Sequence, residues 1–142
     1  PLGGIVAPRS LMDRWPEGAH GATFGGNPVA CAAALATLDV LEETDGYRRV
    51  AELGERVLER LRRDLGRHPA VRDVRGLGLM IGVELADAEV TRRVCATCLE
   101  DGVIVLSCGP AGNVLRLAPP LTITDDEIEH GLDVLTAAIA AA

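Results

Sequence analysis

The sequence has 142 residues and a formal net charge of -7, and 48% of its residues are hydrophobic. This composition supports a packed core and excludes a disordered chain. The acidic charge and the near absence of aromatic residues argue against nucleic-acid binding, which needs basic phosphate contacts and stacking side chains. No apolar run is long enough to span a membrane. Four cysteines without a secretory signal favour a reducing, cytoplasmic compartment.

The first part of the chain predicts a long loop followed by an apolar helix. Glycine and proline recur through residues 16–28, and such a long glycine-rich loop usually has a function. Asn27 suits the N-cap of the next helix and Pro28 its first position. The helix predicted over residues 29–43 is apolar nearly all round, so we expect it to be buried against other elements.

The pattern changes near residue 45, which we take as a domain boundary. An amphipathic helix is predicted first, and a helix with a capping box of Thr124 and Glu127 comes last. The element order predicts a small α/β domain with a mixed or antiparallel sheet. The predicted helices are 47–65, 89–101 and a last one from 124, and the predicted strands are 71–75, 79–85, 103–107 and 114–118.

Two places could bind an anion. In the loop over residues 20–28, glycines allow close backbone approach and the Thr23 hydroxyl can donate to a phosphate, although a tight connection into the helix explains the same residues. Arg116 lies in an apolar strand, where its planar fork suits a carboxylate. The alternative is a partly exposed arginine paired with an acid of the protein.

Other reactive side chains are assigned structural roles. Cys95 and Cys98 form a CxxC pair inside a predicted helix, but no second pair or nearby histidine completes a zinc site, so a core role is favoured over a metal site. Glu84 sits in an apolar strand, where a hydrogen-bonding role is expected. The three histidines are scattered and suggest no triad.

Three motifs, in order along the chain, resemble the class III pyridoxal-phosphate-dependent aminotransferases, the family of 4-aminobutyrate, ornithine and acetylornithine aminotransferases. They are HGATFGGNPVACAAAL at 20–35, VRGLGLMIGVEL at 74–85 and CGPAGNVLRLAPPLTIT at 108–124. The resemblance covers nearly the whole chain, and the last motif is most similar to the 4-aminobutyrate branch. The connection at 86–90 is shorter than the family often has.

The resemblance implies a C-terminal part of a fold-type-I enzyme. Residues 1–45 would be the end of the large cofactor domain, and residues 46–142 the small α/β domain, whose mixed or antiparallel sheet is flanked by helices. The cofactor would be pyridoxal 5'-phosphate. Thr23 matches the threonine that binds the cofactor phosphate of the neighbouring subunit in a homodimer. Arg116 matches the arginine that binds the substrate carboxylate.

The same resemblance implies that the lysine which holds the cofactor lies just before residue 1. This sequence contains no lysine, so none of its residues is expected to be the catalytic lysine, and the chain alone is expected to be inactive. The whole enzyme would move an amino group from an amine or ω-amino acid to a 2-oxo acid. Two alternatives stay open: a decarboxylase or racemase of the same family, and a free-standing dimerisation or binding module.

Overall fold

A computed structural model describes residues 2–142, and its contacts divide the chain into two compact units. The first unit ends at Gly46, and the second spans Tyr47–Ala142. Among the residues described, no helix combines the length and hydropathy that crossing a membrane requires.

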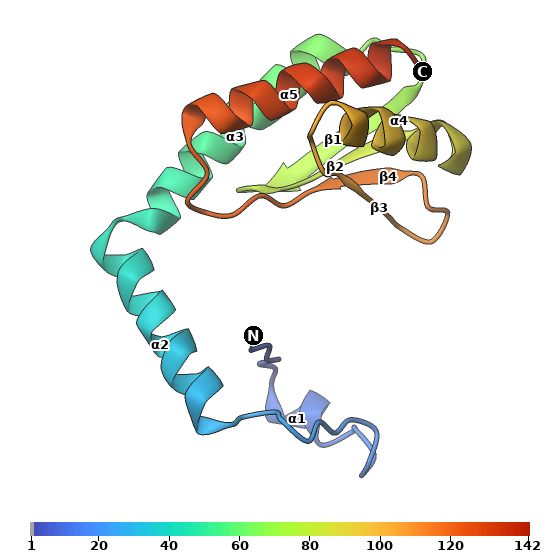
Figure 1. Ribbon diagram of the computed structural model, residues 1–142. Helices are drawn as coiled ribbons and strands as arrows, with labels where there is room; N and C mark the ends of the chain where they lie inside the picture. The colour runs from blue at the N-terminus through green and yellow to red at the C-terminus, as the bar shows by residue number, and fades with distance from the viewer. Residues whose placement is uncertain (1) are drawn as a thin grey trace. The chain divides into compact units, whose positions relative to one another are not determined.

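The first unit contains a short helix, α1 (Arg9–Met12), a long loop, and α2 (Pro28–Glu43) (Figure 1). The predicted start of α2 is confirmed, because the Asn27 side chain accepts a hydrogen bond from the backbone N–H of Ala30 at 2.9 Å. The expectation that this helix is buried is wrong for these 142 residues, in which none of its side chains is buried. Its apolar residues surround the helix, so no single face could cover them all.

The second unit begins with α3 (Gly46–Leu65), a strongly amphipathic helix. Its predicted apolar stripe is confirmed: Leu53, Val57, Leu61 and Leu65 are all at most 3% exposed. Spacings of three and four residues place these side chains on one face, which packs into the hydrophobic core of the unit.

Four strands form an antiparallel sheet, in the order β1-β2-β4-β3. Two strand boundaries differ from the prediction by more than one residue. The first strand extends to residue 77, and the third begins three residues later than expected, because the N–H of Val103 donates to the carbonyl of Cys98 and closes the end of the preceding helix. The strands are β1 (Val71–Leu77), β2 (Met80–Leu85), β3 (Leu106–Cys108) and β4 (Val114–Leu117).

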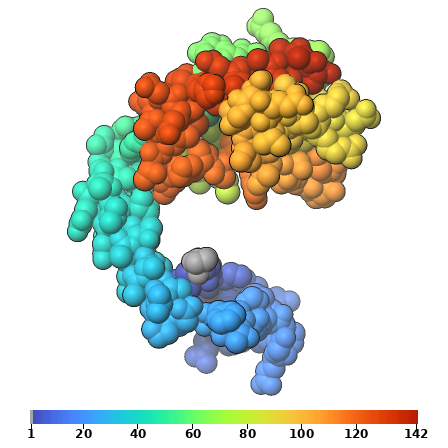
Figure 2. Space-filling model, viewed as in Figure 1, coloured from blue at the N-terminus to red at the C-terminus, as the bar shows by residue number. Residues whose placement is uncertain are grey.

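The helices α3, α4 (Ala88–Glu100) and α5 (Asp125–Ala140) lie on one face of this sheet, as Figure 1 shows. Figure 2 shows α5 in red beside α4 in yellow, and these two helices contact each other. The capping box predicted from Thr124 and Glu127 is present at the start of α5. Alternate residues of β2 and β4 point into the core below the helices, among them Val83, Leu85 and Leu115, each fully buried.

Candidate functional site

The sheet face opposite the helices carries Arg116. Because strand residues alternate between faces, the burial of Leu115 places Arg116 on the other, exposed side of β4. Across the sheet, Arg116 is paired with Gly82 of β2 and Leu106 of β3. Gly82 contributes no side chain beside Arg116, and Arg116 itself is exposed.

The acidic side chains of the neighbouring strands are already engaged by another arginine. Arg75 binds Asp73 at 2.7 Å and Glu84 at 2.9 Å. These two carboxylates, Asp73 foremost, raise the pKa of Arg75. The expected hydrogen-bonding role of Glu84 is confirmed. In residues 2–142 no ion pair or hydrogen bond engages the side chain of Arg116, so the alternative in which a protein acid neutralises it is not found there.

An apolar hollow of about 490 Å³ opens next to this strand and has Arg116 in its wall. Its lining comes from β4, from the segment leading into β3, and from the first turns of α5, including Leu117, Ile128 and Leu132. A mainly apolar hollow with an arginine among its lining residues suits a ligand that has a carboxylate on an aliphatic chain, because apolar surroundings strengthen a charge-assisted hydrogen bond.

The other predicted site residue, Thr23, lies in a turn of the first unit. The N–H of Gly25 donates to the carbonyl of Ala22 at 3.2 Å, and Gly26 adopts a left-handed φ of +71°. Thr23 is exposed, and its hydroxyl has no hydrogen bond within the described part of the chain. Because Thr23 and Arg116 belong to different units, the structure fixes no distance between them.

The two cysteines of the CxxC pair lie on α4. Cys98 is fully buried in the core, and burial is the main cause that raises its pKa to about 11. Burial also raises the pKa of Cys95. Both thiols are therefore poor nucleophiles at neutral pH. The interpretation of Cys98 as a core residue is confirmed, and no group of three potential metal ligands occurs among residues 2–142.

Sequence reasoning missed Arg49 of α3. Its guanidinium donates to the backbone carbonyls of Leu121 and Ile123, in the connection between β4 and α5. These partners are 72 and 74 residues away along the chain. A surface arginine on an amphipathic helix carries no local signal of such a contact, so only the tertiary structure could reveal it.

Comparisons with known proteins match the sequence of this chain to one family. The family model described as "Aminotransferase class-III" matches residues 1–139. The chain is 40% identical over 144 residues to 4-aminobutyrate aminotransferase GabT of Escherichia coli (strain K12), covering 96% of this chain and 34% of that protein. It is 45% identical over 135 residues to acetylornithine aminotransferase of Methanothermobacter thermautotrophicus (strain Delta H), covering 95% of this chain and 34% of that protein.

Comparison with solved structures gives the same family. An aminotransferase from Bacillus anthracis superposes with a TM-score of 0.77 at 37% sequence identity, over 87% of this chain and 30% of that one. The present chain thus spans about a third of the length of the proteins it matches. Its fold is the corresponding part of the fold of those enzymes. The chain belongs to the class III aminotransferases.

Proposed function

We propose that the full-length protein containing these residues is a pyridoxal-phosphate-dependent aminotransferase. It would transfer an amino group from an amine or an ω-amino acid such as 4-aminobutyrate to a 2-oxo acid. Membership of the family supports the reaction type. The observation that carries the substrate class is Arg116, an exposed arginine that lines an apolar hollow and has no ion-pair or hydrogen-bond partner for its side chain among residues 2–142.

Arg116 binds the substrate by its carboxylate in this proposal. Its guanidinium offers two parallel N–H donors to the two oxygens of a carboxylate, which fixes the direction of the substrate as well as its position. The apolar wall formed by residues such as Leu117 and Ile128 excludes water from the aliphatic part of the substrate. The amino group at the far end of the substrate is then held at a defined distance from Arg116.

The loop around Thr23 fits the phosphate of the cofactor. The Thr23 hydroxyl is exposed, and a side chain added at Gly26 would meet no atom within 4 Å, so a phosphate oxygen has room to approach. When bound, pyridoxal phosphate supplies an electron sink for the bonds of the amino-bearing carbon. Because this chain contains no lysine, we infer that the residue which holds the cofactor covalently lies outside these 142 residues, and that they are inactive alone.

We further infer that the enzyme is a homodimer, in which Thr23 binds the cofactor phosphate of the neighbouring subunit. Residues 1–45 would then be the end of the large cofactor domain and residues 46–142 the small domain. The exposed apolar side chains of α2, among them Val29 and Leu35, support a role in contacts with further parts of the enzyme. The free thiols of the four cysteines support a cytoplasmic location.

The substitution Arg116→Lys in the full-length enzyme tests the substrate class. Lysine keeps the charge and loses the planar fork, so kcat/KM for 4-aminobutyrate should fall by about tenfold or more. A plain alkylamine donor has no carboxylate and should lose much less. The measurement is the ratio of the two kcat/KM values in wild type and variant, with the melting temperature recorded as a control for stability.

An unchanged ratio would show that Arg116 does not bind the carboxylate. Equal losses for both donors together with a lower melting temperature would assign Arg116 a structural role instead. A full-length enzyme that releases CO₂ from its substrate, or inverts its configuration, without forming a new amino acid would contradict the transfer reaction itself.

A further inference from the structure

We propose that Arg49 is a positioning residue for substrate binding, acting by holding the connection between β4 and α5. This inference rests on the proposed role of Arg116, which lies on β4 just before that connection. Arg49 itself lies in the first turn of α3, on another element of the same unit.

Arg49 makes two hydrogen bonds to this connection. One terminal nitrogen of Arg49 donates to the carbonyl of Leu121 at 2.8 Å, and the other donates to the carbonyl of Ile123 at 2.5 Å. A guanidinium is planar and rigid, so binding two carbonyls two residues apart fixes the backbone between them. A lysine, with one nitrogen at its end, could not match both positions with the same geometry.

The connection has few other restraints in its middle. At its start, Leu117 is paired with Ile81 in the sheet, and at its end Thr124 caps α5. Between them, Pro119 and Pro120 have no backbone N–H to donate. The N–H of Ile123 donates to the carbonyl of Pro120, which closes one turn. Ile123 packs against the core, and Arg49 adds the two hydrogen bonds that tie the backbone of this turn to α3.

The connection also shapes the hollow beside Arg116. Pro119 and Ile123 line that hollow together with Arg116. If the turn were released from Arg49, the side chain of Ile123 could move, and the end of β4 would lose its fixed continuation. The carboxylate of a substrate would then meet Arg116 in a less defined geometry, which weakens binding more than it slows the reaction of bound substrate.

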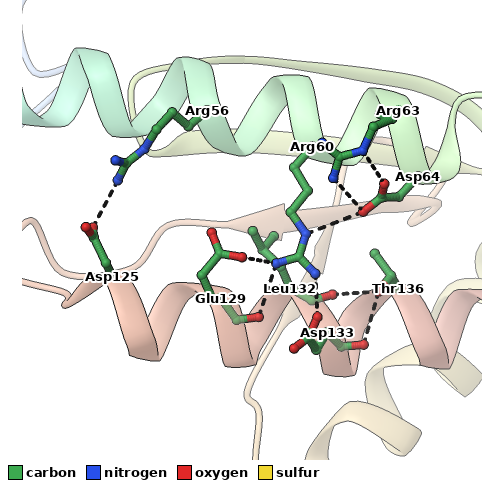
Figure 3. Close-up of polar contacts among 9 residues, drawn as sticks. All are labelled: Arg56, Arg60, Arg63, Asp64, Asp125, Glu129, Leu132, Asp133 and Thr136. Carbon is green, nitrogen blue, oxygen red and sulfur yellow. Dashed lines mark hydrogen bonds and ion pairs between the residues drawn. The ribbon is translucent and has the colours of Figure 1, made fainter.

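Arg56 offers a matched control on the same helix. It lies seven residues after Arg49 and binds Asp125 at 3.0 Å, at the first position of α5 and beyond the connection (Figure 3). Both arginines thus link α3 to the region before or within α5. Of these two contacts, that of Arg49 reaches the turn at residues 120–123 and that of Arg56 does not.

The experiment compares Arg49→Gln, Arg56→Gln and Arg116→Lys in the full-length enzyme. We expect Arg49→Gln to raise KM for 4-aminobutyrate roughly three- to tenfold with kcat nearly unchanged, and to affect a plain alkylamine donor much less. Arg49→Lys should recover only part of the loss. Hydrogen exchange of the amides at 121–124 should become faster in Arg49→Gln and stay as in wild type in Arg56→Gln.

The outcomes separate this inference from the proposed function. If Arg116→Lys shifts the substrate ratio and Arg49→Gln does not, the role of Arg49 is overturned while the substrate class stands. If Arg116→Lys leaves the ratio unchanged, the proposed substrate class fails and the role of Arg49 falls with it. Suppose instead that Arg49→Gln and Arg56→Gln lower the catalytic efficiency for both donors equally and lower the melting temperature equally. Arg49 would then only stabilise the packing of α3 against α5, which would also overturn the inference.

Discussion

At the scale of single residues, Gly54 shows how a missing side chain sets a packing distance. This glycine lies in α3, where glycine is unfavourable because of its backbone freedom. A Cβ at this position would lie 2.3 Å from the carbonyl oxygen of Gly78, in the turn between β1 and β2. Gly78 has a φ of +54° and cannot readily take a side chain either. The helix and the hairpin turn therefore meet backbone to backbone.

The substitution Gly54→Ala should lower the free energy of unfolding by roughly 2 kcal/mol, because backbone atoms on both sides leave no room for the new methyl group. Gly131→Ala is the matched control. Gly131 lies in α5, and a Cβ there would meet no atom within 4 Å, so this change should stabilise the chain by about 1 kcal/mol through helix propensity. Urea unfolding of both variants measures whether each substitution lowers or raises the free energy of unfolding. A neutral Gly54→Ala would show that the contact is not close in solution.

At the scale of elements, arginines of α3 bind acidic residues of α5 (Figure 3). Arg60 is the centre of this cluster, because its guanidinium contacts Asp64 on its own helix and both Glu129 and Asp133 on α5. Its side chain is only 17% exposed, whereas Glu129 and Asp133 are mostly exposed. The Asp133 carboxylate is the main cause that raises the pKa of Arg60, so the cation persists at every pH at which the protein folds.

Arg60→Ala should therefore destabilise the chain by about 1 kcal/mol, since a network around one largely covered arginine contributes more than an isolated surface pair. Arg63→Ala is the control: this arginine is 69% exposed and binds the adjacent Asp64, and its loss should change stability by less than about 0.5 kcal/mol. The difference in stability between the two variants should shrink in 1 M salt, because the Debye length there is only about 3 Å and charges in water are screened from each other. Equal effects of the two variants in thermal unfolding would contradict a bridging role of Arg60.

At the scale of the whole molecule, three carboxyl groups link stability to pH. The pKa of Asp87 is lowered chiefly by the N–H of Val90 at the start of α4, and that of Glu127 chiefly by the N–H of Thr124 at the start of α5. The pKa of Asp64 is lowered chiefly by its hydrogen bond with Arg63. For each group the folded chain holds the charged form, so the unfolded chain binds protons first as pH falls.

The stabilising contribution of these groups is complete above their unfolded pKa values, about 4, and is lost as pH falls through the lower folded values. In Asp87→Asn the free energy of unfolding should fall less as pH falls, because an asparagine still caps the helix and has no carboxyl group to titrate. The free energy of unfolding, measured by urea titration between pH 6 and about pH 2, gives both slopes. Parallel profiles for wild type and Asp87→Asn would contradict the assigned role of the cap.

The sequence alone determined those features that depend on residues close together in the chain. The starts of α2 at Asn27 and of α5 at Thr124 could be predicted, because a helix cap is a contact over three residues. The buried stripe of α3 followed from its spacing of three and four residues. The three motifs identified the family, and Arg116 was singled out because an arginine in an apolar strand is unusual.

Only the tertiary structure decided which distant surfaces meet. It placed β4 between β2 and β3 and paired Glu84 with Arg75, and within residues 2–142 the side chain of Arg116 has no ion-pair partner. It also revealed the hydrogen bonds of Arg49 to the connection after β4 and the contact of Gly54 with Gly78. Residue spacing shows which side of an element an atom lies on. Partners dozens of residues apart are chosen by the packing of whole elements, which no local pattern records.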